Sequence, residues 1–181
     1  MLDFLSPETY QGFQDWLIAN PTWAGLAVFT ISMSESLAVI GLFIPGLVMM
    51  GIIGALVNTG FLELIPTLMW AILGAIVGDG VSYYIGHRFK EHLPAYWPFR
   101  IFPQWLERGK KFFIHHGGKS IIIGRFVGPV RPFIPVVAGM MDMKPREFLI
   151  ANIFSALVWA PIYMLPGFGL AQLYAQFKDF F

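Results

Sequence analysis

Long apolar runs separated by breaks dominate the first half of the chain, and their lengths predict its helices. A first run is interrupted at Pro45-Gly46. The run 47–57 that follows is about 11 residues, or roughly 16 Å of helix, against a membrane core of about 30 Å. Because that run is too short to cross a membrane alone, we predict that 23–58 forms a re-entrant hairpin with Pro45-Gly46 at its tip. Residues 61–86 are long enough to span the membrane.

The second half of the chain repeats this pattern. Its first apolar stretch is too short to span, Gly128-Pro129 interrupt it, and the apolar run resumes at Pro132. We therefore predict a second hairpin over 119–143 and a second spanning helix over 146–165. A hairpin followed by a spanning helix, twice, entered from opposite sides, is the plan of an inverted-repeat transporter. The predicted fold class is an all-α polytopic membrane protein with two opposed re-entrant hairpins.

The uneven placement of charge orients these elements. Residues 1–20 carry acids and no lysine or arginine, and they are predicted to form a helix with Ser6 as N-cap, either interfacial or docked on the protein. This helix should be periplasmic if 23–58 is a re-entrant hairpin, and on the other side if 23–43 spans the membrane. Residues 87–118 form a basic amphipathic segment, so the positive-inside rule makes the loop 87–119 cytoplasmic. Residues 166–181 are predicted to form a short C-terminal segment. Seven of the 12 basic side chains lie in the loop: Arg88, Lys90, Arg100, Arg108, Lys110, Lys111 and Lys119.

Composition agrees with a membrane protein. Hydrophobic residues make up 56% of the 181 residues and charged residues only 13%, against about 25% charged residues in a soluble domain. The absence of cysteine excludes disulfides and thiolate metal sites. The net charge of +1 gives no indication of nucleic-acid binding. We predict a multi-pass integral membrane protein.

Two arginines in the predicted second hairpin are energetically anomalous. Arg125 and Arg131 lie in a stretch otherwise apolar enough for a membrane interior, where each arginine costs roughly 3 kcal/mol to insert. Gly128, Pro129 and Pro132 prevent a continuous helix between and after them. Because six residues of unbroken helix would place the two side chains about 240° apart, we expect this break to let both arginines converge on one site.

Two acids in the first half are candidates to compensate the arginines. Glu35 lies ten residues before Pro45, and Asp79 lies inside the predicted spanning helix, next to a face formed by Gly74 and Gly78. That spacing of glycines lets another helix backbone approach closely. The acids and arginines are expected to form either a structural salt-bridge cluster or a functional polar centre. Both roles are combined if the ion pairs open when substrate enters.

Four segments of the chain resemble the DedA family, which is defined by the VTT domain. They are Phe29-Thr-Ile-Ser-Met-Ser-Glu35 followed by Phe43-Ile-Pro-Gly46, the glycine-rich stretch 74–86 around Asp79, the arginine motif 113–139, and the pattern from Asn152 to Trp159. The resemblance covers residues from about 25 to 170. The arginine motif in combination with Gly78-Asp79 is its most specific part.

The resemblance implies an inner-membrane location, two opposed re-entrant hairpins and lipid handling. Members are known as undecaprenyl-phosphate flippases and as phospholipid transporters or scramblases, some of which depend on the proton-motive force. Family roles fall on Glu35, Asp79, Arg125 and Arg131. The chain departs from the family at Leu47, where many members carry an acid after the tip.

The predicted function is translocation of a lipid phosphate, with Arg125 and Arg131 as headgroup ligands. Guanidinium is planar, always charged and matched to two phosphate oxygens. Glu35 or Asp79 is expected to release the arginines or to couple a proton, and Gly46 to shape the first tip. Undecaprenyl phosphate is favoured over a glycerophospholipid on the resemblance alone. Membrane lipids are the other expected partners, homo-oligomerisation is left open, and no cofactor or nucleic acid is expected.

The sequence also bears on three alternatives to a simple lipid transporter. The Arg125 to Arg131-Pro132 spacing superficially echoes the start of a membrane phosphatidic-acid phosphatase motif, but the remaining motif is missing, so we predict no enzyme. Adjacent histidines such as His115-His116 point about 100° apart on a helix, so no metal site is expected. A proton-coupled small-molecule or drug exporter and the lipid-delivery domain of a longer lipid-phosphatase fusion stay open.

Overall fold

The regular structure of this protein is helical. The computed structural model describes residues 19–43, 46–97, 99–127 and 131–178, together with Gly12 and Asp15. All regular elements of these described residues are helices and none is a strand, which confirms the predicted all-α class. The interfacial helix predicted over 1–20 falls almost wholly outside the described residues. The tip residues Pro45, Gly128 and Pro129 also lie outside them.

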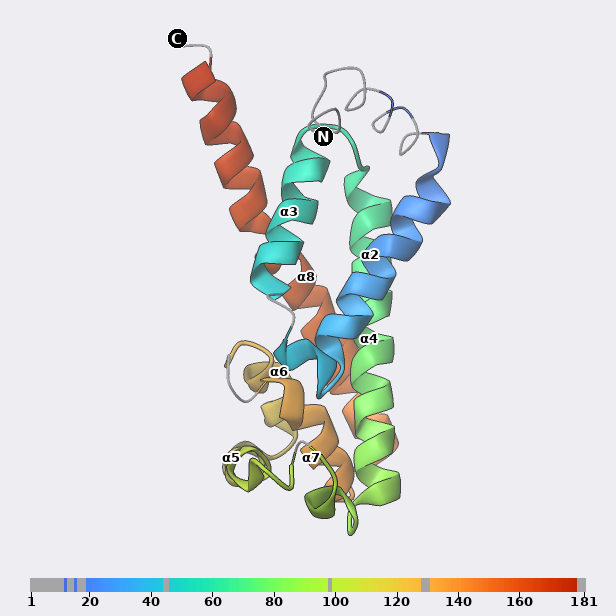
Figure 1. Ribbon diagram of the computed structural model, residues 1–181, viewed down its shortest axis with the longest axis vertical. Helices are drawn as coiled ribbons and strands as arrows, with labels where there is room; N and C mark the ends of the chain where they lie inside the picture. The colour runs from blue at the N-terminus through green and yellow to red at the C-terminus, as the bar shows by residue number, and fades with distance from the viewer. Residues whose placement is uncertain are drawn as a thin grey trace.

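Two long helices run along most of the molecule (Figure 1). Helix α4 (Leu64–Phe89) has 26 residues and α8 (Pro145–Lys178) has 34. Both are long and apolar enough to cross a membrane, α8 by its segment Pro145–Gly169. They lie where the sequence places its two spanning helices.

Helix α8 is longer than the sequence indicates. The pattern places the end of the second spanning helix at residue 165 and a separate segment over 166–181, whereas the helix continues to Lys178 with Pro161 and Pro166 inside it. Prolines are tolerated inside membrane helices because neighbouring groups satisfy the backbone carbonyls that they leave free. The apolar segment Pro145–Gly169 is therefore followed by further helix rather than by a break.

The first half folds back on itself halfway along the molecule. Helix α2 (Pro21–Ser36) runs from one end to the middle, and α3 (Gly46–Asn58) returns to the same end (Figure 1). Between them lies the short 3-10 helix η2 (Ile40–Leu42). The backbone N–H of Ala38 donates to Ser82 Oγ at 3.1 Å, which fixes this connection against α4.

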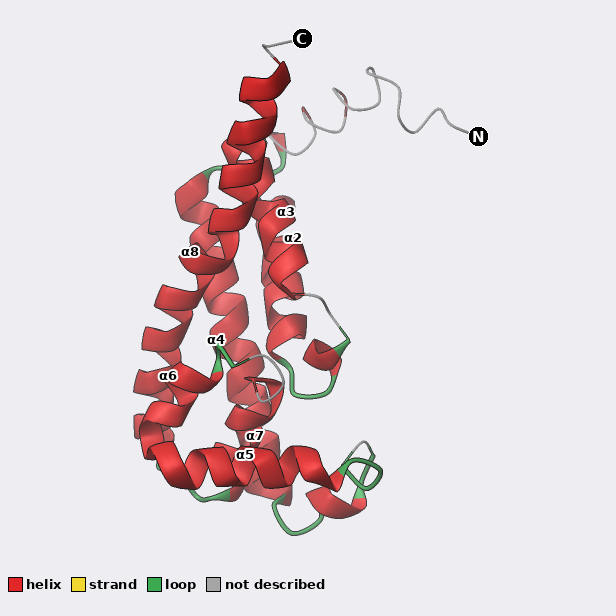
Figure 2. Ribbon diagram, turned by 90° about the vertical axis from the view of Figure 1, so that its left-hand side faces the viewer, coloured by secondary structure: helices red, strands yellow, loops and turns green. Residues whose placement is uncertain are grey.

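The second half folds back from the opposite end. Helix α6 (Ser120–Gly124) leads to the middle of the molecule, where the 3-10 helix η5 (Arg131–Phe133) starts the return, and α7 (Ile134–Met140) leads back (Figure 1). Helix α5 (Pro103–His116) lies across the long axis at that end (Figure 2). Short 3-10 helices η3 (Leu93–Ala95) and η4 (Gly117–Lys119) flank α5.

Glycines allow α2 to pack closely on α4. A Cβ added at Gly74 would clash with the carbonyl oxygen of Phe29, and one added at Gly78 would clash with that of Met33. The close helix approach predicted from the spacing of these two glycines is therefore confirmed.

The two return helices pack on the long helix of the other half. Helix α3 packs on α8, where Gly54 faces the carbonyl of Met164 and Gly167 faces that of Gly51. Helix α7 packs on α4, where Gly86 faces the carbonyl of Val136. The outward surface of the long helices is apolar, with Leu73, Val77 and Val81 exposed on α4 and several residues exposed on α8: Leu149, Ile150, Ile153, Phe154, Leu157, Ile162 and Leu165.

Candidate anion site at the centre of the molecule

Arg125 and Asp79 form a buried ion pair. Arg125 follows the last residue of α6, and its Nη2 donates to Asp79 Oδ2 on α4. The two side chains are 3% and 9% exposed. The same nitrogen also donates to Asn152 Oδ1 on α8 at 3.3 Å, and Asn152 Nδ2 in turn donates to the carbonyl of Ile76 at 3.1 Å. Arg125 is thus held between the two long helices.

Arg131 and Glu35 form a second pair, which joins the two folded-back segments. Glu35 lies in the last turn of α2 and Arg131 opens η5, and Arg131 Nη1 donates to Glu35 Oε1. The side chain of Glu35 is 1% exposed and that of Arg131 is 14% exposed. A Cβ at Gly46 would overlap the Glu35 carboxyl group, so any side chain at this position would displace that carboxyl group.

Aromatic rings of α8 lie against both arginines. The guanidinium carbon of Arg131 is 5.0 Å from the centre of the Trp159 ring and 5.3 Å from that of Tyr163, and that of Arg125 is 5.5 Å from the Trp159 ring. Cation–π contacts contribute about 0.5–1 kcal/mol at exposed sites and about 2 when desolvated. Because Trp159 is fully buried, its ring stabilises two guanidinium groups without adding negative charge.

The two ion pairs and the Trp159 ring together form the central cluster. Some of its buried polar atoms have no hydrogen-bond partner in the described part of the chain. Among the described residues, the buried atoms Arg125 Nη1, Arg131 Nη2, Trp159 Nε1 and Glu35 Oε2 have no hydrogen-bond partner. Three of these are donors, and an unpaired buried donor is costly. The cluster therefore retains donors for an acceptor-rich group.

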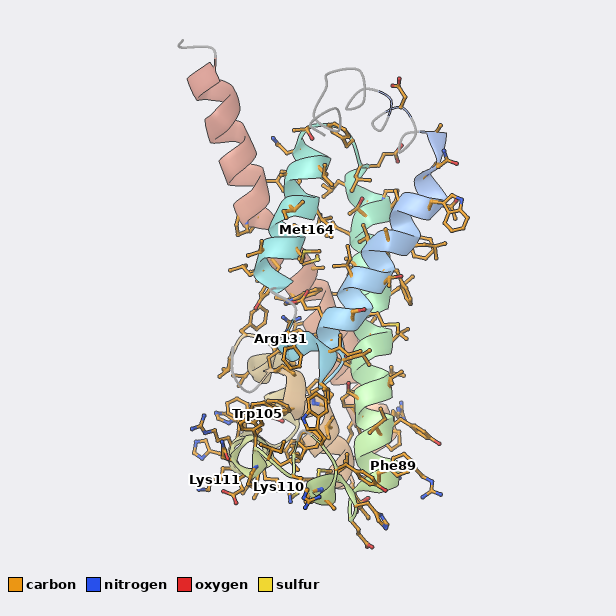
Figure 3. The ribbon with its side chains drawn as sticks, viewed as in Figure 1. Phe89, Trp105, Lys110, Lys111, Arg131 and Met164 are labelled. Atoms are coloured by element: carbon orange, nitrogen blue, oxygen red, sulfur yellow. The ribbon has the colours of Figure 1, made fainter. Side chains whose placement is uncertain are left out.

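The cluster is closed in this structure. The cavity bordered by Asp79, Arg125, Arg131 and Pro135 measures only about 10 Å³, which is close to the minimum for one water molecule. A phosphate group needs more room, so the cluster must rearrange before it can hold a ligand of that size. Figure 3 shows Arg131 about halfway along the molecule, below the lower end of α3.

The structure brings together all four charged residues singled out from the sequence: Glu35, Asp79, Arg125 and Arg131. Gly46 lies against Glu35, and Pro132 is buried in η5. Sequence reasoning missed the contacts of Asn152, Trp159 and Tyr163 with the arginines. One feature of the sequence could have indicated them: an otherwise apolar helix that carries the amide of Asn152 and two aromatic residues with polar atoms.

Basic and aromatic side chains collect at the α5 end. Lys110 and Lys111 lie there with Trp105 and Phe89 (Figure 3). Beside them Lys90 Nζ donates to Asp142 Oδ2 at 2.7 Å, and this hydrogen bond lowers the pKa of Asp142 below its ordinary value. The part of the chain that the structure describes contains no group of three or more metal-ligating side chains.

The chain matches known membrane proteins. Residues 44–169 match the VTT domain. Over 154 residues, 85% of this chain and 61% of the relative, it is 35% identical to inner membrane protein YabI of Escherichia coli (strain K12). Over 149 residues, 81% of this chain and 68% of the relative, it is 36% identical to protein DedA of the same strain. No solved structure matches this chain.

A Buchnera aphidicola membrane protein is 36% identical over 155 residues, which are 86% of this chain and 60% of the relative. The chain thus spans about three fifths of the length of the Buchnera relative and of YabI. The VTT match covers more than half of the chain, and DedA is matched at 36% identity over 68% of its own length. This chain belongs to the DedA family of VTT-domain membrane proteins.

Proposed function

We propose that this protein translocates a lipid phosphate across the bacterial inner membrane, with its headgroup bound by Arg125 and Arg131. The observation that carries the proposal is the central cluster. Two arginines share one buried site, and each keeps one unpaired guanidinium nitrogen. Guanidinium is the side chain best matched to phosphate oxygens, and its interaction is strongest where water is excluded.

The packing of the helices supports an inverted repeat in the membrane. In this proposal α2–α3 and α6–α7 are re-entrant hairpins that enter from opposite faces, with α4 and α8 as the spanning helices. The return helix of each half packs on the long helix of the other half, as expected if the halves are related by inversion. The basic α5 end is assigned to the cytoplasm and the α3 end to the periplasm.

The same geometry supports an exchange mechanism. In the closed state the carboxylates of Asp79 and Glu35 occupy positions on the guanidinium groups that phosphate oxygens would take. Displacement or protonation of an acid frees the corresponding guanidinium nitrogen. The freed nitrogen and the two guanidinium nitrogens that already lack a partner among the described residues can then donate together, so an incoming phosphate is bound by several donors at once.

Transport by reconstituted vesicles tests the proposal. Arg131→Lys keeps the charge but removes the two-pronged geometry, so undecaprenyl phosphate or phosphatidic acid should cross about tenfold more slowly or worse, equivalent to about 1.4 kcal/mol in the barrier. Arg146→Lys, an exposed position at the start of α8, is the matched control. Transport by Arg131→Lys at the rate of the control would refute the role of Arg131.

One observation favours a second candidate, a proton-coupled exporter of small molecules. Glu35 is almost completely buried and one of its carboxyl oxygens has no partner among the described residues, as suits a proton-binding group. In that case vesicles without lipid phosphate would still conduct protons, and Glu35→Gln would abolish the flux. No proton flux in the absence of lipid phosphate would leave the transporter proposal as the better one.

A further inference from the structure

An apolar groove, the α3–α8 groove, runs between α3 and α8. Its walls are residues of α3 from Leu47 to Ala55 and, on α8, Pro166 and Gly167, and its volume is about 360 Å³. Two glycines border the groove where the helices cross: the Gly167 backbone packs on the Gly51 carbonyl, and Gly51 leaves space for the groove. The chain is a membrane protein, so this surface, which has no polar side chain, suits a hydrocarbon ligand.

The α3 wall of the groove begins at the central cluster. Gly46, the residue before Leu47, lies directly against the Glu35 carboxyl group. Leu47 and Val48 are both exposed in the groove. A hydrocarbon chain in the groove would therefore begin at Leu47, next to Gly46, which contacts the carboxyl group that pairs with Arg131.

The α8 wall of the groove is continuous with the cluster as well. Trp159, Tyr163, Pro166 and Gly167 are spaced i, i+4, i+7 and i+8, which places them on one stripe of the helix. The rings of Trp159 and Tyr163 lie against the arginines, and Pro166 and Gly167 line the groove. Arg131, the more exposed of the two arginines, contacts both of these rings.

A second apolar groove does not share this continuity. It lies between α4 and α8, is larger at about 500 Å³, and is lined on α8 by Pro161, Met164, Leu165 and Phe168. At 100° per residue these four positions fall on the side of α8 opposite the Trp159–Gly167 stripe, and Gly169, which also borders this groove, lies between the two sides. Volume alone would favour this groove, but it does not lead from the arginines.

We propose that the α3–α8 groove binds the hydrocarbon tail of the lipid whose phosphate is held at Arg131, so that lipid enters the site sideways along α3. This inference rests on the proposed function. Headgroup and tail then occupy one continuous site: a polar end at Glu35 and Arg131, and an apolar path that leads from it toward the α3 end of the molecule.

Photo-crosslinking in phosphatidylcholine nanodiscs tests the tail site directly. The probe is hexadecyl phosphate with a diazirine halfway along its chain, and unlabelled hexadecyl phosphate or hexadecanol competes with it. Label on 47–55 and 163–167 should fall at least tenfold with excess hexadecyl phosphate and not with hexadecanol. Label on the outward α4 residues Leu73, Val77 and Val81 should not change. Competed label on α4 equal to that in the groove would overturn the inference.

Two glycine variants supply a matched pair for the same assay. A Cβ at Gly51 meets only ordinary contact, 4.0 Å from the Gly167 nitrogen, and one at Gly80 meets nothing within 4 Å. Gly51→Leu fills the groove, so the competed label there should fall at least tenfold, whereas Gly80→Leu should label like wild type. Equal competed label in the two variants would overturn the inference.

A third variant separates the tail inference from the proposed function. Arg131→Ala should lose the competed label in the groove. If it keeps that label while Gly51→Leu loses it, the groove binds tails and the headgroup assignment fails. If Arg131→Ala abolishes competed label that maps elsewhere on the protein, the headgroup assignment stands and the groove assignment fails.

Discussion

Asp79→Asn should destabilise the protein strongly. The substitution keeps the shape of the side chain but leaves the Arg125 charge in a site where the two side chains are 3% and 9% exposed. Removing one partner of a buried pair costs about 3–5 kcal/mol. Asn152 and the Trp159 ring remain in contact with Arg125 and hold the cost near the lower end of that range. For a chain of this size the loss corresponds to a fall in Tm of roughly 6–20 °C.

A double-mutant cycle in detergent micelles measures the origin of this loss. Asp79→Asn, Arg125→Gln and the double variant are compared with wild type by thermal unfolding. Because the double variant contains no unpaired charge, it should be more stable than either single variant. Glu147→Gln breaks an exposed pair with Lys144 and should change Tm little. A double variant no more stable than Asp79→Asn, or an unchanged Tm for Asp79→Asn, would refute the argument from buried charge.

Three further outcomes follow from the packing and the charges. Glu35→Gln should lower Tm less than the asparagine substitution above, because its arginine is 14% exposed and lies over two aromatic rings; an equal or larger loss would contradict this. Gly167→Ala should lower Tm because its Cβ would clash with the Gly51 carbonyl, whereas Gly51→Ala should leave Tm unchanged. Equal Tm values for the two variants would contradict the close crossing of α3 and α8 at Gly167. The hydrogen bond from Lys90 lowers the pKa of Asp142 below 3.8, so the stability it contributes is present above about pH 4 and is lost as pH falls through the lowered value. Thermal unfolding from pH 7 to pH 2 should show this acid loss in wild type and not in Asp142→Asn.

The composition of the central cluster could be predicted from the sequence because burial of charge is so costly. Arg125 and Arg131 need counter-charges in an apolar chain, and Glu35 and Asp79 are the acids inside the other apolar runs. The pairing could not be predicted. It depends on how α4 meets the end of α6 and how α2 meets η5, and nothing local distinguishes the pairing seen here from the opposite one.

The contacts of the Trp159 and Tyr163 rings with the arginines could not be predicted, for a related reason. Trp159 lies 28 positions after Arg131 in the sequence, and its place under both guanidinium groups depends on the rotation of α8 about its axis. The glycine contacts show the same limit. Gly74 and Gly78 lie four apart and indicate a close helix approach, whereas Gly86 has no such partner in sequence and meets the Val136 carbonyl only because α7 folds back on α4.

Charge balance sets a condition on the proposed transport. The closed cluster contains two guanidinium groups and two carboxylates, so a phosphate adds one or two negative charges to a neutral site with a cavity of about 10 Å³. Uncompensated charge in such a site costs several kcal/mol, so a carboxylate must be protonated or move out as phosphate enters. The two acids are not equivalent in this respect. Loss of the Asp79 contact leaves Arg125 with a hydrogen bond to Asn152, whereas loss of the Glu35 contact leaves Arg131, among the described residues, with only the Trp159 and Tyr163 rings. Neutralising Glu35 therefore both restores the charge balance and frees the Arg131 guanidinium group beside the α3–α8 groove.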